Sequence, residues 1–371
     1  MVVTPTLSRS RRLRQTPYSD RVEACGAKAY TVYNHMLLAT VFRSLEEDYQ
    51  HLCENVQIWD VSCERQVEIT GPDAAALTQL MTCRDLSKAK YGQCFYAPLV
   101  DENGGMVNDP IILKLAEDRY WLSIADSDVL LWAKGLASGR GMDVKVFEPD
   151  VFPLAVQGPM AEEVMAKVFG EKVRDIKFFR FAELFYQNHR MVVARSGWSR
   201  QGGFEIYLDN SALALDLWDR IWDVGKDYNI FAGCPNGIER VEGGLLSYGN
   251  DMSSENTPYE CGLGKYVNLE ADIEFVGRKA LEIARDQGLG RKICNIRFDK
   301  RLETSVSKSW DVLNVGGDHI GNISSGCNSK KMGGFIAIAM LDQEFWDEGT
   351  IVLVQTPLGD LTGTVANFPF D

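Results

Sequence analysis

The chain has 371 residues, a length that favours two or three domains. Its formal net charge is −13, and 45 % hydrophobic with 25 % charged residues is an ordinary globular composition. The acidic balance argues against nucleic acid as a partner, because phosphate backbones bind basic surfaces. No stretch approaches the roughly 20 apolar residues of a spanning helix and no secretory signal is evident, so we expect a cytoplasmic protein that does not bind membranes.

The first features along the chain are a basic run and a repeat. Arg9, Arg11, Arg12 and Arg14 indicate a solvated N-terminal arm that packs or frays. The segments 67–74 and 154–161 then share one pattern, a strand, a Gly-Pro turn and the start of an apolar helix. The pattern predicts a pair of related α+β subdomains, with coincidence of a common strand-to-helix connection as the alternative.

Further elements follow from turn and periodicity signals. Segments 93–100 and 106–115 form a predicted hairpin around residues 101–105, which contain the turn dipeptide Asn103-Gly104. A strand over 121–125, a helix over 126–137, strands over 190–195 and 204–208, a helix over 211–228 and a helix over 236–249 come next.

The last 80 or so residues change to short β segments separated by turns, which predicts a small antiparallel barrel. The predicted strands are 291–298, 320–324, 335–341, 351–355 and 361–365. We expect an α+β protein in which residues 1–290 form a core of two interleaved subdomains and residues 291–371 form the barrel. Within the core, about 61–150 is inserted between 1–60 and 151–290.

Cysteine and histidine spacing argues against a metal centre. The nine cysteines contain no Cys-x-x-Cys pair, and the four histidines are scattered. We expect reduced thiols and no metal site.

Asp109 is the first candidate for chemistry. Alternation along 106–113 places Val107, Asp109, Ile111 and Leu113 on one apolar face. A carboxylate among apolar neighbours is costly unless it is paired or used, and Pro110 predicts a bulge or a sheet edge beside it. The alternative is a structural Asp109 bound to backbone amides at that bulge.

Glu205 and Tyr207 form the second candidate site. They alternate with Phe204, Ile206 and Leu208 along one predicted strand. A carboxylate beside a phenol suits a planar ligand with a donor edge, such as a pterin. From spacing alone, ordinary solvent-facing alternation is the favoured explanation of the pattern.

Together these segments resemble the glycine-cleavage T-protein (aminomethyltransferase) family over nearly the whole chain. The matching motifs are Gly71-Pro72-x-Ala74, Gln93–Tyr96, Glu102–Asp109, Gln157-Gly158-Pro159, Ala194–Ser199 with Gly203–Glu205, Arg240–Leu245 with Tyr248–Asp251, and Pro369-Phe370. The resemblance implies a three-lobed cloverleaf, with two α/β subdomains around a central folate channel and a C-terminal antiparallel β-barrel.

The pattern is more similar still to the dimethylsulfoniopropionate (DMSP) demethylase branch of that family. The segments that carry this likeness are Tyr30–Leu38, Ile58–Val61, Glu64–Ile69, Leu80–Ser87, and Cys234–Asn236 followed by Leu245–Asp251. Three positions depart from the aminomethyltransferase pattern: Asn108 replaces the first residue of an Asp-Asp pair, Ser199–Gly203 replaces a Thr-Gly-Glu-Asp-Gly loop, and Asn236 replaces an arginine.

This likeness implies tetrahydrofolate as co-substrate and an onium compound as methyl donor, with a homodimer as a compatible assembly. It implies that Asp109 is catalytic, that Glu205 anchors the pterin, and that Tyr207 contacts the folate. A sulfonium offers no hydrogen-bond donor, so aromatic faces or a carboxylate should hold it. Among the candidate aromatics we assign Tyr96 and Trp198 to the folate, and Tyr33 and Trp121 to the substrate.

The expected activity is transfer of a methyl group from DMSP to tetrahydrofolate, which gives methylmercaptopropionate and 5-methyltetrahydrofolate. Three alternatives stay open at this point. They are an aminomethyltransferase that works with a lipoylated carrier, a demethylase of another onium or methylamine, and a folate-binding module without catalytic activity.

Overall fold

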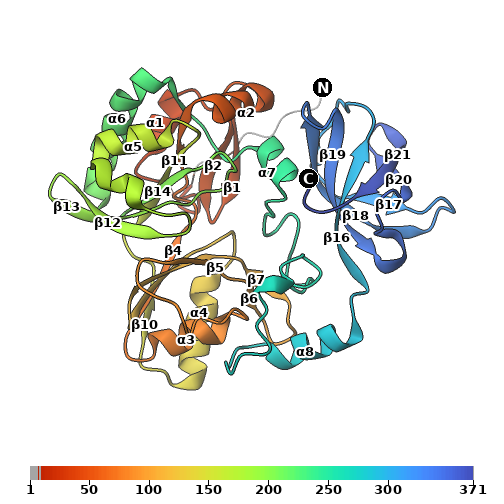
Figure 1. The fold of residues 1–371 in the computed structure, drawn as a ribbon, viewed down its shortest axis with the longest axis horizontal. Coiled ribbons are helices and arrows are strands. Elements are labelled where there is room, and N and C mark those ends of the chain that lie inside the picture. Colours follow the sequence, from red (N-terminus) through yellow and green to blue (C-terminus); the bar gives the residue numbers. More distant parts are fainter. Residues whose placement is uncertain (1–6, 8–9, 371) are drawn as a thin grey trace.

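The computed structural model describes residue 7 and residues 10–370, and Figure 1 shows three lobes grouped around a common centre. Arg9 of the basic run lies outside the described residues. Arg14 of the same run packs against the body, because its Nη2 atom lies 2.6 Å from Oε1 of Glu148.

The first lobe is built on a six-stranded sheet. Its neighbours are antiparallel except β15, which runs parallel to β3. In spatial order the strands are β12 (Phe181–Tyr186), β13 (His189–Ala194), β14 (Gly203–Leu208), β11 (Phe152–Gln157), β3 (Val56–Asp60) and β15 (Ile230–Ala232).

Helices and a hairpin complete this lobe. They are α1 (Ser19–Ala24), α2 (Leu45–Glu54), α5 (Ala161–Phe169), α6 (Ala214–Gly225), the hairpin β1 (Ala29–Tyr33) and β2 (Met36–Val41), and the 3₁₀ turns η1 (Glu171–Asp175), η2 (Ser211–Leu213) and η3 (Lys226–Tyr228). The amphipathic pattern predicted for 211–228 is confirmed, because Leu217, Trp218 and Ile221 of α6 are buried in the main core of the lobe.

The second lobe is an antiparallel five-stranded sheet with two helices. Its strands, in spatial order, are β10 (Lys145–Phe147), β4 (Gln66–Thr70), β9 (Arg119–Ser123), β8 (Ile111–Ala116) and β5 (Cys94–Tyr96). The helices are α3 (Ala74–Met81) and α4 (Val129–Arg140), and a short ladder joins β6 (Leu99–Val100) to β7 (Met106–Asn108).

The two predicted strand-turn-helix units have the same local geometry. Gly71 follows β4 with φ 129° and Gly158 follows β11 with φ 117°, a region that favours glycine. A Cβ atom at Gly158 would lie 2.3 Å from the carbonyl oxygen of Asn55, so the turn needs glycine for space as well. In each unit the amide three residues after the glycine donates to the glycine carbonyl, Ala74 to Gly71 and Ala161 to Gly158.

The third lobe is a closed antiparallel barrel, as the sequence predicts. Its strands, in order around the barrel, are β16 (Arg291–Phe298), β19 (Gly334–Asp342), β18 (His319–Ser329), β17 (Trp310–Leu313), β20 (Ile351–Thr356) and β21 (Gly359–Ala366), with η5 (Gln343–Phe345) between β19 and β20. Strand β17 was not predicted, because only Trp310 and Val312 of its four residues are buried and so short a segment gives little alternation. The predicted α+β class with a C-terminal barrel is confirmed.

One predicted helix is wrong in length. The expected helix over 236–249 ends early, at α7 (Gly237–Gly243), because Gly244 adopts the left-handed conformation with φ 64° and the amide of Leu245 donates back to the carbonyl of Arg240. The chain then continues as a loop through η4 (Gly264–Tyr266) to α8 (Arg278–Gln287), which precedes the barrel.

Two apolar clusters join the lobes. Trp121 and Leu113 of the second lobe pack against Tyr207 and Val192 of the first. A larger cluster connects α7 and the loop after it with Met106 of the second lobe and Ile336 of the barrel. The lobes are therefore fixed around the centre by buried contacts. The exact division at residues 60, 150 and 290 stays a prediction. No helix in the described part of the chain is long and apolar enough to cross a membrane.

Candidate functional site

A cavity of about 1190 Å³ lies where the three lobes meet. The β1–β2 hairpin, the loop after β3, the segment 196–200, the loop after α7, and Phe368 and Pro369 beyond the barrel all contribute to its wall. Pockets for drug-sized ligands occupy roughly 300–1,000 Å³. The cavity therefore has room for one such ligand together with a smaller molecule.

Asp109 faces this cavity from the break between β7 and β8. The amide of Ala97 donates to the carbonyl of Pro110, and Pro110 has no amide to continue the ladder, so the strand is interrupted there. The single apolar face predicted for 107–113 is wrong as a result. Val107 packs in the core of the second lobe, whereas Ile111 and Leu113 pack between the lobes.

Only one of the two oxygens of the Asp109 carboxylate has a hydrogen-bond partner. Tyr96 donates its hydroxyl to Oδ2 at 2.9 Å, whereas Oδ1 is buried and has no hydrogen-bond partner. Burial raises the pKa of Asp109 to about 7, although the Tyr96 hydrogen bond acts in the opposite direction. A buried group that changes charge near neutral pH and keeps one free oxygen is suited to accept a proton from a ligand.

Glu205 and Tyr207 lie on the face of β14 that looks toward the second lobe. Phe204, Ile206 and Leu208 pack on the opposite face, in the core of the first lobe. Glu205 is 6 % exposed and Tyr207 is 1 % exposed, so the alternative of solvent-facing alternation is wrong.

Glu205 lines the cavity and Tyr207 does not. Ser196 donates a short hydrogen bond to Oε2 of Glu205. Burial raises the pKa of Glu205, and the interactions with the hydroxyls of Ser196 and Tyr207 partly oppose this. In this structure Tyr207 therefore supports the carboxylate from behind the cavity wall.

Glu64 is a cavity residue that the sequence reasoning did not select. It lies in the loop after β3, beside Cys63, and lines the same cavity as Asp109 and Glu205. Burial raises the pKa of Glu64 strongly, and the charges of Glu205 and Asp109 raise it further. The sequence Ser62-Cys63-Glu64-Arg65 has no periodicity that separates a cavity-facing glutamate from a solvated one, so no local signal identified it.

The four candidate aromatic residues do not share one position. Tyr33, Tyr96 and Trp198 line the cavity. Trp121 does not; it is 2 % exposed, donates its Nε1–H to Glu68 at 2.8 Å, and packs its ring 6.1 Å from that of Tyr207. The structure thus places Trp121 in the contact between the lobes, away from the predicted substrate position.

Basic side chains also line the cavity. Arg240 of α7 is paired with Asp251 at 2.7 Å, and its guanidinium carbon lies 6.0 Å from the ring centre of Trp198. Lys265 and Arg200 are exposed, and neither forms an ion pair within the described part of the chain. They are available to an anionic group of a ligand, such as a carboxylate.

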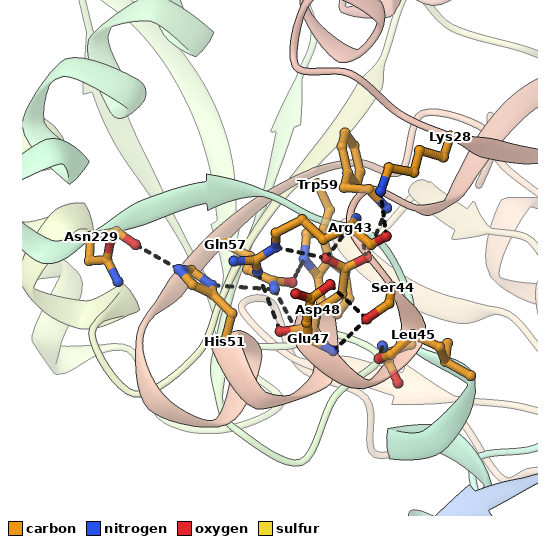
Figure 2. A network of polar contacts seen from close by, with 12 residues as sticks. Lys28, Arg43, Ser44, Leu45, Glu47, Asp48, His51, Gln57, Trp59 and Asn229 are labelled. Carbon is orange, nitrogen blue, oxygen red and sulfur yellow. Dashed lines mark hydrogen bonds and ion pairs between the residues drawn. The ribbon is translucent and has the colours of Figure 1, made fainter.

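Figure 2 shows the polar network that holds α2 beside the site. Asp48 accepts the amides of Phe42 and Arg43, and Gln57 of β3 donates to the carbonyl of Asp48 at 2.9 Å. His51 bonds the carbonyl of Asn229 at 2.9 Å through Nε2, and burial lowers the pKa of His51.

The same network reaches the cavity wall through α7. Asn236 caps α7 by accepting the amide of Ile238, and its side-chain amide donates to the carbonyl of Leu45 at 3.0 Å. Pro235 and Gly237, on either side of Asn236, line the cavity. The bonds around α2 therefore fix where this part of the wall begins.

The described residues contain no group of three or more His, Cys, Asp or Glu side chains arranged to hold a metal ion. The site instead has four carboxyl groups, those of Glu64, Asp109, Asp126 and Glu205, with phenols, an indole and basic side chains around one central cavity. Such a fold and site define a three-lobed enzyme that acts on a small molecule within a pre-formed chamber.

Comparisons with known proteins agree on one family. The model of the GCVT N-terminal domain matches residues 18–271, and that of the glycine cleavage T-protein C-terminal barrel domain matches residues 291–371. The chain therefore belongs to the glycine cleavage T-protein family, and the resemblance found in the sequence is confirmed.

Individual relatives span nearly the whole chain. Dimethylsulfoniopropionate demethylase DmdA of Ruegeria pomeroyi is 53 % identical over 350 residues, which cover 94 % of this chain and 95 % of the relative. The aminomethyltransferase of Bacillus cytotoxicus is 30 % identical over 364 residues, covering 96 % and 98 % of the two chains. The crystal structure of the aminomethyltransferase T of Bartonella henselae superposes with a TM-score of 0.85 over 97 % of this chain and 98 % of that one, at 23 % identity, which supports the fold.

Proposed function

We propose that this protein is a methyltransferase that moves a methyl group from DMSP to tetrahydrofolate, with methylmercaptopropionate and 5-methyltetrahydrofolate as products. The observation that carries the proposal is the 53 % identity to a DMSP demethylase over 94 % of the chain. Aminomethyltransferases of the same family match at 30 % identity.

The cavity residues fit a pterin. A pterin presents a ring N–H beside an exocyclic amine, and the carboxylate of Glu205 can accept from both. The unpartnered buried Oδ1 of Asp109 is a second acceptor that the protein itself leaves unused. An orphaned buried acceptor is costly, so a ligand donor at this position relieves the cost.

When bound, tetrahydrofolate supplies N5, a nitrogen nucleophile able to take a methyl group. The S–CH₃ bond of the donor breaks as the N–CH₃ bond forms, and the electron pair of the broken bond stays on sulfur as a neutral thioether. Asp109 accepts, through Oδ1, the proton that the nitrogen loses. The sulfonium is already activated, so the remaining task of the cavity is to align the two ligands, which contributes about 7–11 kcal/mol in favourable cases.

The positions that depart from the aminomethyltransferase pattern have structural partners here. Asn108 is buried, and its Nδ2 atom donates to the carbonyl of Ala125 at 3.0 Å and to Oγ of Ser127 at 2.8 Å. An aspartate could not donate to these acceptors. Gln201 likewise donates to the carboxylate of Glu239. An ionised aspartate at position 108 would lose both hydrogen bonds that Asn108 donates.

The test is to incubate the protein with tetrahydrofolate and, separately, DMSP, glycine betaine, dimethylglycine and an aminomethylated lipoyl carrier, and to separate the folate products by chromatography. We expect 5-methyltetrahydrofolate with DMSP. Formation of 5,10-methylenetetrahydrofolate from a lipoyl-bound aminomethyl group, with no 5-methyl product from DMSP, would favour the aminomethyltransferase activity instead.

A cytoplasmic location and a homodimer belong to this proposal as well. Sedimentation velocity of the purified full chain distinguishes a dimer from a monomer.

A further inference from the structure

The cavity has more carboxyl groups than the proposed folate contacts use. Glu64, Asp109, Asp126 and Glu205 line it, and none of the four forms an ion pair with a lysine or arginine in the described part of the chain; Asp126 is engaged by the amide of Asn34, which donates to its Oδ1 at 2.8 Å. Glu64 lies close enough to Glu205 and Asp109 for their charges to oppose its ionisation. Like charges buried together are unfavourable unless a cation joins them.

A second observation indicates that a ligand completes this cluster. Asp109 lines the cavity, and its Oδ1 atom is buried and has no hydrogen-bond partner. Tyr33 lines the same cavity, and burial together with the nearby acidic groups, Glu64 first among them, raises the pKa of its phenol. The phenol of Tyr33 and the carboxyl group of Glu64 thus belong to the wall of one cavity.

We infer that Glu64 is the counter-charge for the positive centre of the methyl donor, and that with Tyr33 it makes the cavity selective for onium compounds over neutral molecules of the same shape. The inference rests on the proposed methyl transfer, and it assigns the residue that recognises the donor. The proposed function gives Glu205 and Asp109 contacts with the pterin, whereas it gives Glu64 no role.

The chemistry of an onium centre explains why these two side chains suit it. A sulfonium or a quaternary ammonium has no N–H or O–H to donate, so only charge and aromatic faces hold it. Glu64 supplies the charge and Tyr33 the aromatic face. An uncharged group of the same size gains nothing from the carboxylate and requires its burial, so the site discriminates against it.

The backbone around Glu64 is well fixed, which suits a recognition residue. The amide of Glu64 donates to the carbonyl of Val61 at 2.9 Å, and the side chain of Gln66 donates to the carbonyl of Glu64 at 2.8 Å. The side chain of Glu64 also interacts with Ser123, which itself accepts from Gln66. A carboxylate held this way needs little reorganisation when the cation arrives.

The test compares two unreactive ligands of equal shape, the cation 3-(trimethylammonio)propanoate and its carbon analogue 4,4-dimethylpentanoate. Dissociation constants are measured by calorimetry on the full chain without folate, for the unaltered protein and for Glu64→Gln. We expect the unaltered protein to prefer the cation by about tenfold or more, and Glu64→Gln to lose that preference through weaker binding of the cation alone.

Two further variants separate recognition from folding. Glu68→Gln alters a buried glutamate that lies outside the cavity, paired with Arg119, and should leave the preference unchanged. Glu64→Asp keeps the charge and should retain a preference for the cation. An unchanged ratio in Glu64→Gln, or equal binding of the two ligands by the unaltered protein, overturns the inference.

This binding assay is independent of the reaction. A protein that prefers the cation but transfers no methyl group from DMSP to tetrahydrofolate would contradict the proposed function and leave the role of Glu64 intact. Methyl transfer from DMSP without a cation preference would do the opposite.

Discussion

Replacing Asp109 by asparagine should raise the stability of the protein while removing most of its activity. Burial raises the pKa of Asp109 from 3.8 to about 7, and this difference corresponds to about 4 kcal/mol between the charged and the neutral carboxyl group in the folded protein. Because the pKa is raised, the Asp109 carboxyl group makes its whole contribution to stability below about pH 4, and this contribution is lost as the pH rises through 7. Asparagine has the same shape, carries no charge and can still accept the Tyr96 hydroxyl.

At pH 8 we therefore expect Asp109→Asn to be more stable by about 1–3 kcal/mol, because relaxation and water reduce the full electrostatic cost. For a chain of this length that gain raises the Tm by about 1–4 °C. At pH 5 the carboxyl group is protonated in the folded protein but ionised in the unfolded chain, so the gain from asparagine should be much smaller than at pH 8.

Scanning calorimetry of both proteins at the two pH values measures this difference directly. The kcat of methyl transfer should fall by about 10²–10⁴ in the same variant, since no group remains to accept the proton. A variant that is less stable at pH 8, or one that gains equally at pH 5 and pH 8, would refute the assignment of a buried charge to Asp109. Near-normal turnover would refute its role as the proton acceptor.

Three other predictions follow from the same contacts. Tyr96→Phe removes a hydrogen bond that lowers the pKa of Asp109, so the acidic limb of the profile of kcat/KM against pH should move to higher pH; an unmoved limb would mean that another group sets it. Glu205→Ala should weaken tetrahydrofolate binding by tenfold or more in titration calorimetry, and an unchanged affinity would count against the pterin anchor. Burial lowers the pKa of His51, so its contribution to stability is present above about pH 6.5 and is lost as the pH falls; in His51→Gln the decline of the Tm between pH 7 and pH 5.5 should be shallower than in the unaltered protein, and an equal decline would mean that His51 does not cause the loss of stability in acid.

The elements that the sequence predicts well are those whose signals are local. The two Gly-Pro turns, the apolar stripe of α6 and most barrel strands each depend on residues within a few positions of one another, and the structure confirms them. The helix expected over 236–249 is too long because Gly244 can either continue a helix at a cost or end it in the left-handed conformation; the close approach of Pro369, 2.5 Å from where a Cβ on Gly244 would lie, comes from the far end of the chain and leaves no local signal.

The candidate site was harder to predict, since it depends on how the lobes meet. Alternation correctly placed Glu205 and Tyr207 on one face of β14, but it could not show that another lobe covers that face. The same closure buries Trp121 in the contact between lobes and turns Glu64 toward the cavity. The local sequence around an aromatic side chain or a carboxylate does not show whether a distant part of the chain will pack over it.

The wall of the cavity also has a consequence for how the protein is made. Residues 31–41 lie on one part of it, and Phe368 and Pro369 lie on another. A ribosome must therefore deliver almost every residue of the chain before the chamber can close around a ligand. Folate present during synthesis cannot stabilise an early folding intermediate by binding at this site, because the site does not yet exist. The lobes must therefore pack together before folate can bind there.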